Sequence, residues 1–402
     1  MDDARAHVLD RVWGVPPYET VPLAEAVGRV AATRVLAEEA VPPFDNSAMD
    51  GYAVRSADTA RVPAVLRAVG TTLAGQAAAA EVASGEVVRI MTGAPVPPGA
   101  DAVVPIEKVE VLDEGGAIRL TSPAIVGEHV RRAGDDIQVG DPVLMAGTVV
   151  SPGHLGVLAT VGVGEVEVVR RPRVGVLSTG DELVTGGGPL AAGQIRDSNR
   201  IALLALVDAA GGEAVDLGLA PDDAEAITKA LLHGVSTCDV VLTSGGVSMG
   251  DVDLVKEVLD LLGDMRWMQV AIRPAKPFAF GLVDRVPVFG LPGNPVSSVV
   301  SFELFARPAI RRLCGLPENQ LDRPYPAAIA VDGLPRRPDG KVHFVRVRVI
   351  VGADGRLEAR SAGDQGSHHL TALAAANGLA VLPDGDGVEP GSPVDVLLIG
   401  DL

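Results

Sequence analysis

The sequence has 402 residues, 47% of them hydrophobic, which suffices for roughly two to four domains with separate cores. Its 52 acidic residues against 34 basic ones give a formal net charge of −18. This charge excludes a general nucleic-acid or membrane-surface binder, because the summed field repels polyanions. A local basic or amide-lined pocket can still hold a small anion.

Cysteine content and the start of the chain predict a cytoplasmic protein. Cys238 and Cys314 are too few for a disulfide framework or a multi-cysteine metal cluster. The first residues lack the basic and apolar regions of a signal peptide, and no uninterrupted apolar stretch is long enough to cross a bilayer. We therefore expect a reducing environment and no membrane segment.

The first 170 residues predict an elongated helical part with a β-rich insertion. Apolar residues at helical spacing predict helices over residues 4–13, 23–40 and 152–160. Short apolar runs between turns predict strands at residues 87–91, 102–105, 110–112, 117–120 and 142–144. We assign residues 1–43 and 140–170 to a discontinuous elongated domain, and residues 44–139 to the inserted β-rich domain.

From residue 171 onward, strands alternate with helices, which predicts a covered, mostly parallel sheet in an α/β domain over residues 171–318. Its strands are expected at residues 173–177, 213–217, 239–242, 268–272 and 286–290. Its helices are expected at residues 199–210, 222–234, 253–262 and 295–313. Residues 319–402 return to short strands, at 327–331, 342–349, 357–360, 378–382 and 393–398, which predicts a small C-terminal β-barrel or sandwich.

Polar or glycine-rich segments follow four of the strands, and ligands of open parallel sheets bind at the carboxyl ends of strands. The segments cover residues 178–183, 243–253, 273–277 and 291–298. In the second, Ser244-Gly245-Gly246 and Ser248 can bond phosphate oxygens through amides and hydroxyls. Asp251 and Asp253 could hold Mg²⁺ there, although Asp253 could equally cap the following helix.

The remaining segments leave more than one interpretation open. Gly293-Asn294 opens a helix at Pro295 with glycine for close approach, but the segment is neither a Walker A loop nor a dinucleotide fingerprint. Arg273 and Lys276 could serve an oxyanion or belong to a solvated loop. The polar residues 45–50 could equally form a turn-rich connector. Histidine spacing does not favour a zinc site, and no serine-hydrolase elbow is present.

Taken together, these segments resemble the MoeA and gephyrin E-domain family of molybdopterin molybdenumtransferases. Nine ordered segments carry the resemblance, at residues 44–53, 91–104, 131–137, 172–183, 194–200, 243–253, 272–280, 291–298 and 366–368. Two positions depart from the family pattern: Ala275 stands where glycine is usual, and Arg273 where lysine is common. Arginine keeps the charge but changes the donor geometry, and alanine adds a Cβ.

The resemblance implies insertion of molybdenum from molybdate into adenylylated molybdopterin, with Mg²⁺-dependent cleavage of the pyrophosphate and release of AMP. It implies a catalytic set of Asp50, Thr92, Glu182, Asp222, Asp253 and Lys276, with the metal held by Asp50, Glu182, Asp222 and Asp253. It also implies binding positions for the substrates at Ser178, Thr179, Gly180, Asp181, Ser244, Gly245, Gly246, Ser248, Arg273, Pro292, Gly293, Asn294, Ser297, Arg346 and Ser367.

The same resemblance implies an architecture and partners. We expect a discontinuous elongated domain, an inserted β-rich domain, a three-layer molybdopterin-binding α/β domain and a C-terminal β-barrel. The family forms homodimers with the site between subunits, which would bring Asp50 and Thr92 against the α/β domain of the partner subunit. A molybdopterin adenylyltransferase and molybdoenzyme apoproteins are candidate partners. The alternatives are a non-catalytic, peptide-binding scaffold, or an adenylyltransferase, which the two β modules disfavour.

Overall fold

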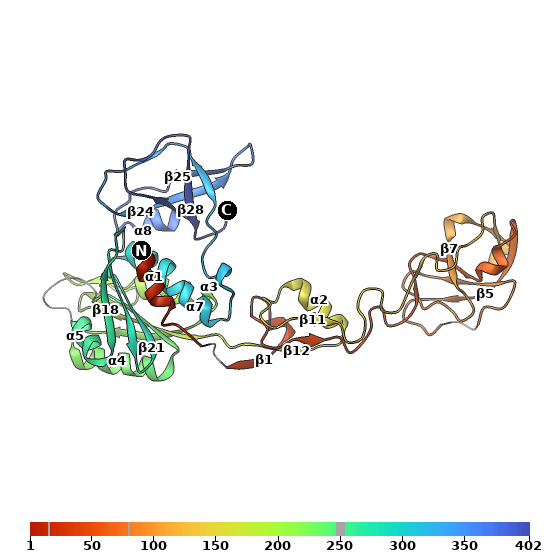
Figure 1. The fold of residues 1–402 in the computed structure, drawn as a ribbon, viewed down its shortest axis with the longest axis horizontal. Coiled ribbons are helices and arrows are strands. Elements are labelled where there is room, and N and C mark those ends of the chain that lie inside the picture. Colours follow the sequence, from red (N-terminus) through yellow and green to blue (C-terminus); the bar gives the residue numbers. More distant parts are fainter. Residues whose placement is uncertain (15–16, 79–80, 247–253) are drawn as a thin grey trace. The chain divides into compact units, whose positions relative to one another are not determined.

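The computed structural model describes residues 1–14, 17–78, 81–246 and 254–402. These form two compact units, and each is described by itself (Figure 1). The first unit comprises residues 1–19, 28–32 and 167–402, and the second comprises residues 20–27 and 33–166. Within the described ranges, no helix combines the length and the apolar character needed to cross a membrane.

A six-stranded sheet of order β16-β13-β17-β21-β20-β18 forms the centre of the first unit. Its strands are β13 (Arg173–Thr179), β16 (Glu213–Ala220), β17 (Val240–Ser244), β18 (Asp264–Gln269), β20 (Pro277–Val283) and β21 (Val286–Leu291). The pairings from β16 through β21 are parallel, whereas β20 runs antiparallel to both β21 and β18. The parallel part confirms the predicted α/β fold, and strand β20 is an addition to it.

Helices cover both faces of this sheet, which makes the domain three-layered. They are α1 (Asp2–Leu9), α3 (Asn199–Ala210), α4 (Ala224–Thr237), α5 (Leu254–Leu262), α6 (Pro295–Ser301) and α7 (Arg307–Leu313), with a π-helical turn at Phe302–Ala306. Val176 of β13 packs in a core with residues of α1, α3 and α6, whereas the next residue, Leu177, packs in a core with residues of α4 and α5. Successive residues of a strand point to opposite faces, so each buried strand serves both cores.

The C-terminal part of the first unit is a closed β-barrel. Its strands are β22 (Ala327–Ala330), β24 (Val342–Val351), β25 (Leu357–Ser361), β26 (Gly378–Leu382) and β28 (Ser392–Leu398). The ladder β24-β25-β22-β28-β26 closes because β26 also pairs with β24. The shorter elements nearby are β19 (Ile272–Arg273), β23 (Leu334–Pro335), β27 (Gly387–Val388), α8 (Leu370–Ala375) and a 3-10 turn at Glu318–Gln320.

The second unit contains a six-stranded sheet of order β7-β4-β6-β5-β9-β8. Its strands are β4 (Gly51–Val54), β5 (Ala64–Thr72), β6 (Glu86–Ile90), β7 (Ala102–Pro105), β8 (Val109–Leu112) and β9 (Ala117–Leu120). Smaller elements are α2 (Pro152–Thr160), β2 (Val35–Leu36), β3 (Asn46–Ser47), β10 (Val130–Arg131), β11 (Pro142–Leu144) and the 3-10 turns Leu23–Glu25, Ser56–Thr59, Ile106–Lys108 and Asp113–Gly115. Outside this sheet, β1 (Tyr18–Pro22) pairs with β12 (Glu165–Val169).

Two predicted elements are wrong. Residues 23–40 form a 3-10 turn, several turns and bends and the short strand β2 instead of a helix, because Gly28 adopts a left-handed φ of 78° and breaks any helical run. Residues 268–272 do not form one strand: β18 ends at Gln269, and β19 joins the barrel sheet through Ile272 opposite Val342. The loop that carries Lys276 therefore connects the barrel sheet to β20.

Candidate active site

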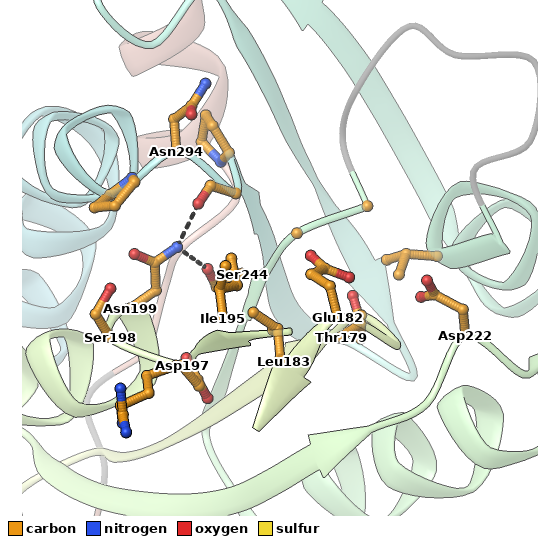
Figure 2. A pocket seen from close by; sticks show the side chains of 18 of the residues that line it. Thr179, Glu182, Leu183, Ile195, Asp197, Ser198, Asn199, Asp222, Ser244 and Asn294 are labelled. Atoms are coloured by element: carbon orange, nitrogen blue, oxygen red, sulfur yellow. Dashed lines mark hydrogen bonds between the residues drawn. The ribbon is translucent and has the colours of Figure 1, made fainter. Parts of the chain in front are cut away.

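Three loops at the carboxyl ends of parallel strands line a cavity of about 880 Å³ in the first unit (Figure 2). They follow β13, β17 and β21, whose parallel order places these ends at one edge of the sheet. The cavity brings together many of the predicted residues, namely Thr179, Gly180, Glu182, Asp222, Ser244, Gly245, Gly246, Pro292, Gly293 and Asn294.

Glycine permits the close approach of these loops. Gly245 and Gly246 have φ values of 103° and 68°, in the left-handed region that residues with a Cβ rarely adopt. A Cβ on Gly245 would lie 2.9 Å from the carbonyl oxygen of Thr179, and a Cβ on Gly293 would lie 3.7 Å from the Cα of Gly245. Backbone of all three loops therefore lines the cavity closely, as a site for phosphate groups requires.

Asn199 joins these loops at the start of α3. Its side-chain amide donates to the Ser244 hydroxyl at 2.8 Å and to the Gly293 carbonyl at 2.7 Å (Figure 2). Sequence reasoning assigned no role to Asn199, although segment 194–200 was among those that carried the resemblance. An asparagine at a predicted helix start, after a polar run, was the available signal.

The segment before α3 is held by a buried carboxylate. Asp197 accepts hydrogen bonds from the Ser178 hydroxyl at 3.1 Å and from the Arg200 Nε at 2.9 Å. Ser178 is itself fully buried and does not line the cavity. The structure therefore places Ser178 behind the cavity wall, where it supports the chain that leads to Asn199.

Two carboxylates face the cavity from the loops after β13 and β16 (Figure 2). Glu182 folds over Gly180, whose added Cβ would lie only 2.6 Å from the Glu182 Oε2. Asp222 and Asp181 exchange bonds: the Asp222 N–H donates to the Asp181 carboxylate at 3.0 Å, and the Asp181 N–H donates to the Asp222 carboxylate at 3.4 Å. Asp181 thus positions Asp222 without lining the cavity.

These carboxylates suit Mg²⁺, which is commonly held by one or two carboxylates together with substrate phosphates and water. Within the described residues, no cluster of three or more histidine, cysteine, aspartate or glutamate side chains is arranged for a metal ion. Of the expected site residues, Ser248 and Asp253 lie outside the described residues, as does Asp251. Among the described residues, Glu182 and Asp222 are therefore the expected metal-binding residues that line this cavity.

A second cavity, of about 440 Å³, contains several of the predicted catalytic and substrate-binding residues. Arg273, Lys276, Ser297 and Ser367 line it, and it shares Pro277 and His368 with the first cavity. Ala275 in the same loop has a left-handed φ of 74°, and its side chain packs in the main core. The methyl group that replaces the usual glycine hydrogen is therefore accommodated mainly by the core.

Arg346 lies behind this second cavity and is fully buried. Its Nη2 donates to the carbonyl of Asp364 at 2.7 Å and to that of Gly366 at 3.1 Å, while its Nε and Nη1 have no hydrogen-bond partner in the described chain. Burial lowers the pKa of the Arg346 guanidinium from its ordinary value. The side chain holds the loop that presents Ser367, and it does not line the cavity in this structure.

Asp50 and Thr92 belong to the second unit. The backbone N–H and the hydroxyl of Thr92 both donate to the same carboxylate oxygen of Asp50, each at 2.8 Å. These bonds lower the pKa of Asp50 below its ordinary value, and the bond from the backbone N–H has the larger effect. The carboxylate is therefore charged at neutral pH. Neither residue lines the two cavities described above.

Family models match three regions of the chain. They are the MoeA N-terminal region (domain I and II) at residues 1–162, a probable molybdopterin binding domain at residues 175–312, and the MoeA C-terminal region (domain IV) at residues 334–399. The three regions follow one another in the order expected from the motifs.

Individual relatives agree with this assignment. The molybdopterin molybdenumtransferase of Haemophilus influenzae is 40% identical over 98% of this chain and 97% of its own, and molybdopterin molybdenumtransferase 2 of Mycobacterium tuberculosis is 41% identical over 91% of each. A crystal structure of the molybdopterin biosynthesis moeA protein of Pyrococcus horikoshii matches 99% of this chain and 98% of its own, with 31% identity and a TM-score of 0.81. By sequence along nearly its whole length, this chain belongs to the MoeA family of molybdopterin molybdenumtransferases.

Proposed function

We propose that this chain inserts molybdenum from molybdate into adenylylated molybdopterin, with Mg²⁺-dependent cleavage of the pyrophosphate and release of AMP. The observation that carries the proposal is the adjacency of two cavities of different chemistry. One is lined by glycine-rich loops and three carboxylates, and the other by three cationic side chains and two serines. The first suits a nucleotide pyrophosphate, the second suits an oxyanion, and their shared lining places the two substrates side by side.

In the first cavity, the chain's own groups bind and orient the pyrophosphate. Backbone amides after β13 and β17 can approach its oxygens because Gly180, Gly245 and Gly246 carry no Cβ. The Thr179 hydroxyl is buried beside Gly245 and has no hydrogen-bond partner among the described residues. Asn199 keeps the loops together, which preserves the geometry for attack.

Glu182 and Asp222 are the described residues that would hold Mg²⁺, and Asp253 would join them. When bound, the ion would neutralise negative charge on the pyrophosphate. Both carboxylates line the same cavity as the glycine-rich loops, so a cation held by them would be close to a bound pyrophosphate.

In the second cavity, Lys276 and Arg273 supply positive charge, and Ser297 and Ser367 supply hydroxyl donors. A tetrahedral dianion such as molybdate accepts hydrogen bonds from both kinds of group. Lys276 lies one residue before Pro277, which lines both cavities. The molybdate is thereby held next to the pyrophosphate and oriented toward it.

Asp50 and Thr92 can reach the site if the chain forms a homodimer. We infer that a second copy of the chain contributes them to the site, because they are polar, charged and already hydrogen-bonded in a unit that lines neither cavity. A molybdopterin adenylyltransferase would supply the substrate, and molybdoenzyme apoproteins would take the product. A cytoplasmic location is consistent with the two free cysteines.

The decisive experiment supplies purified protein with adenylylated molybdopterin, molybdate and MgCl₂ and follows released AMP by chromatography. AMP release should require all three additions and should fall strongly in a Lys276→Ala variant. Absence of AMP from the complete mixture would overturn the proposed reaction. Binding without turnover would instead favour a scaffold role.

The shared site is tested by mixing two inactive variants, Asp50→Asn and Asp222→Asn. Random exchange of subunits makes about half of the dimers mixed, and each mixed dimer has one intact site out of two. About a quarter of the wild-type activity should therefore return. No recovery, with subunit exchange demonstrated by mass spectrometry, would contradict a site built from two subunits.

A further inference from the structure

A third cavity, of about 600 Å³, continues from the second toward the C-terminal barrel. The two share four lining residues, Arg273, Pro274, Gln365 and Gly366. The second cavity in turn shares Pro277 and His368 with the first. The three cavities therefore follow one another, from the barrel to the phosphate-binding loops.

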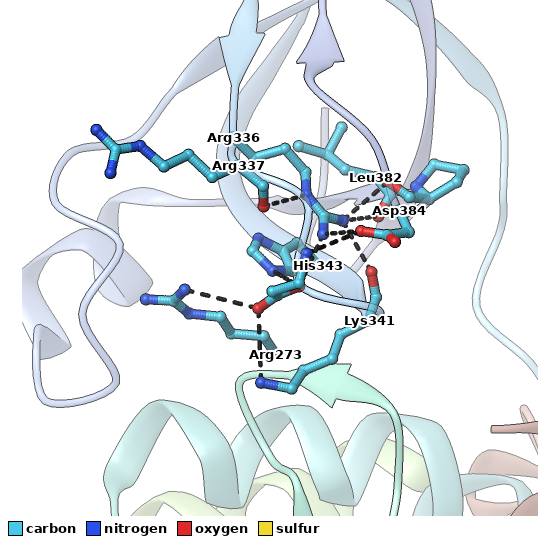
Figure 3. A network of polar contacts seen from close by, with 9 residues as sticks. Arg273, Arg336, Arg337, Lys341, His343, Leu382 and Asp384 are labelled. Atoms are coloured by element: carbon cyan, nitrogen blue, oxygen red, sulfur yellow. Dashed lines mark hydrogen bonds and ion pairs between the residues drawn. The ribbon is translucent and has the colours of Figure 1, made fainter.

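Charged side chains at and beside this third cavity form one network (Figure 3). Arg336 donates to the carboxylates of Asp339 at 2.8 Å and Asp384 at 2.9 Å, and its Nη1 donates to three backbone carbonyls. His343 bonds the same Asp339 oxygen at 3.0 Å, and the Lys341 ammonium lies 3.5 Å from the other. The Arg336 charge is thus matched by two carboxylates.

Two further arginines line the cavity without a close carboxylate partner. The Arg337 guanidinium has no hydrogen bond or ion pair among the described residues, and Figure 3 shows it turned away from Arg336, His343 and Lys341. Arg273 reaches Asp339 only at 3.9 Å, and its side chain is 66% exposed. Burial lowers the pKa of the His343 imidazole below its ordinary value. The cavity therefore carries an excess of positive charge.

We propose that the third cavity is an outer docking site where Arg337 and Arg273 capture a free oxyanion, molybdate, before it reaches Lys276. The proposal rests on the reaction proposed above, and it adds a site and a residue, Arg337, to that reaction. Arginine is suited to this role because its planar guanidinium bonds two oxygens of an oxyanion at once. Arg273 lines both cavities and connects the docking site with the Lys276 cavity.

The charge of the whole chain explains why such a site is useful. With a formal net charge of −18, the protein repels a dianion over most of its surface. A local cationic cavity reverses this field and raises the rate of encounter, an effect that salt screens over about 8 Å at physiological ionic strength. The docking site should therefore act on the capture of molybdate and depend strongly on salt.

The test compares Arg337→Ala and Arg337→Glu with the wild type in the AMP-release assay, with molybdate varied and adenylylated molybdopterin saturating. We expect kcat/KM for molybdate to fall about threefold to tenfold in Arg337→Ala and further in Arg337→Glu. The loss should shrink when the salt concentration rises to about 0.5 M, where the screening length falls to a few ångströms. The KM for adenylylated molybdopterin should not change.

Arg348→Ala is the matched control, because Arg348 is an exposed arginine of the same barrel and lines none of the three cavities. Equal kinetics for the Arg337 and Arg348 variants would overturn the docking site. A loss confined to the KM for adenylylated molybdopterin would overturn it as well, in favour of a nucleotide subsite.

Equilibrium dialysis with molybdate alone separates this proposal from the proposed reaction. Weaker molybdate binding by Arg337→Ala than by Arg348→Ala would support the docking site even if the wild type released no AMP. Equal binding by the two variants would overturn it even if AMP were released normally. Unchanged thermal unfolding of each variant verifies that the fold is intact.

Discussion

The side-chain amide of Asn199 bonds the hydroxyl of Ser244 at 2.8 Å and thereby ties the start of α3 to the end of β17. The same amide group bonds the Gly293 carbonyl at 2.7 Å, so it also holds the loop after β21. The two glycine-rich loops of the cavity are therefore positioned by one residue that lies 45 and 94 positions away along the chain. Asn199 is a positioning residue for the phosphate-binding loops.

Replacement of Asn199 by aspartate keeps its shape and removes both donors. A carboxylate would face the carbonyl of Gly293, and the loops should separate. Two lost hydrogen bonds predict a decrease of about tenfold or more in kcat/KM for adenylylated molybdopterin. Asn319→Asp, at an exposed position in the turn Glu318–Gln320, should leave the kinetics unchanged. A similar kcat/KM for both variants would show that Asn199 does not position the loops.

Glu182→Gln and Asp222→Asn remove the negative charge of the described metal-binding candidates with little change in shape. We expect the MgCl₂ concentration needed for half-maximal AMP release to rise about tenfold or more in each, because a neutral amide binds Mg²⁺ far more weakly than a carboxylate does. Glu225→Gln, in the exposed first turn of α4, is the control. An unchanged magnesium requirement in both cavity variants would remove them from the metal site.

Gly245→Ala should damage the site more than its backbone strain alone explains. Gly245 and Gly391 both have φ values in the left-handed region, 103° and 77°, and alanine there costs on the order of 1 kcal/mol of stability or more. A Cβ on Gly391 meets open space, whereas a Cβ on Gly245 would lie 2.9 Å from the Thr179 carbonyl oxygen.

Urea unfolding and AMP release together distinguish the two effects in these glycine variants. Gly391→Ala should lose stability and keep its activity. Gly245→Ala should lose activity as well, because the Cβ pushes the loops after β13 and β17 apart. Full activity in a folded Gly245→Ala variant would show that close approach of these loops is not required.

Glu303 and Arg323 form a buried pair in which both guanidinium bonds measure 2.9 Å, and the Glu303 side chain is only 1% exposed. Burial, and then the nearby Arg323, lowers the pKa of Arg307 to about 10. Glu303→Gln removes the buried carboxylate that pairs with both Arg307 and Arg323. We expect a loss of about 3–5 kcal/mol in the free energy of unfolding, measured in urea.

The control for this pair is Glu318→Gln, which breaks an exposed ion pair with Arg312 and should cost at most about 1 kcal/mol. Equal losses for the two variants would mean that burial does not strengthen the Glu303 network.

Alkylation of the two cysteines should be slow in the folded protein. Burial raises the pKa of the Cys314 thiol to about 11 and also raises that of Cys238. The thiolate is the reactive form, so little of it exists at pH 8, and its fraction on Cys314 should grow about tenfold per pH unit up to about pH 11. Mass spectrometry after iodoacetamide treatment should show faster labelling in urea than in buffer. Rapid labelling of the native protein would contradict the assigned burial.

Much of the fold was predictable from local patterns. Helix α3 begins and ends where predicted, at Asn199 and Ala210, because its apolar period is regular and Gly211 ends it with a left-handed φ of 99°. Strands β7, β9, β11 and β26 also match their predicted bounds. The glycine-rich segments after β13, β17 and β21 could be predicted because strand patterns and glycine preferences are encoded within a few residues. The strand ends themselves were predicted less well: β13 and β17 each extend two residues, and β21 one residue, beyond the predicted ends.

Only the tertiary structure decided which side chains reach the cavity. Ser178 is buried behind the cavity, and Arg346 is buried beneath the loop that carries Ser367. Asn199 is brought into contact with Ser244 and Gly293. The structure also shows residues 23–40 to consist of turns, bends and one short strand, although their apolar spacing resembles a helix. The physical reason is the sequence separation of the contacts. Periodicity in the sequence reflects neighbours two to four residues apart, whereas these contacts join residues that are distant along the chain and meet only after the sheet has formed.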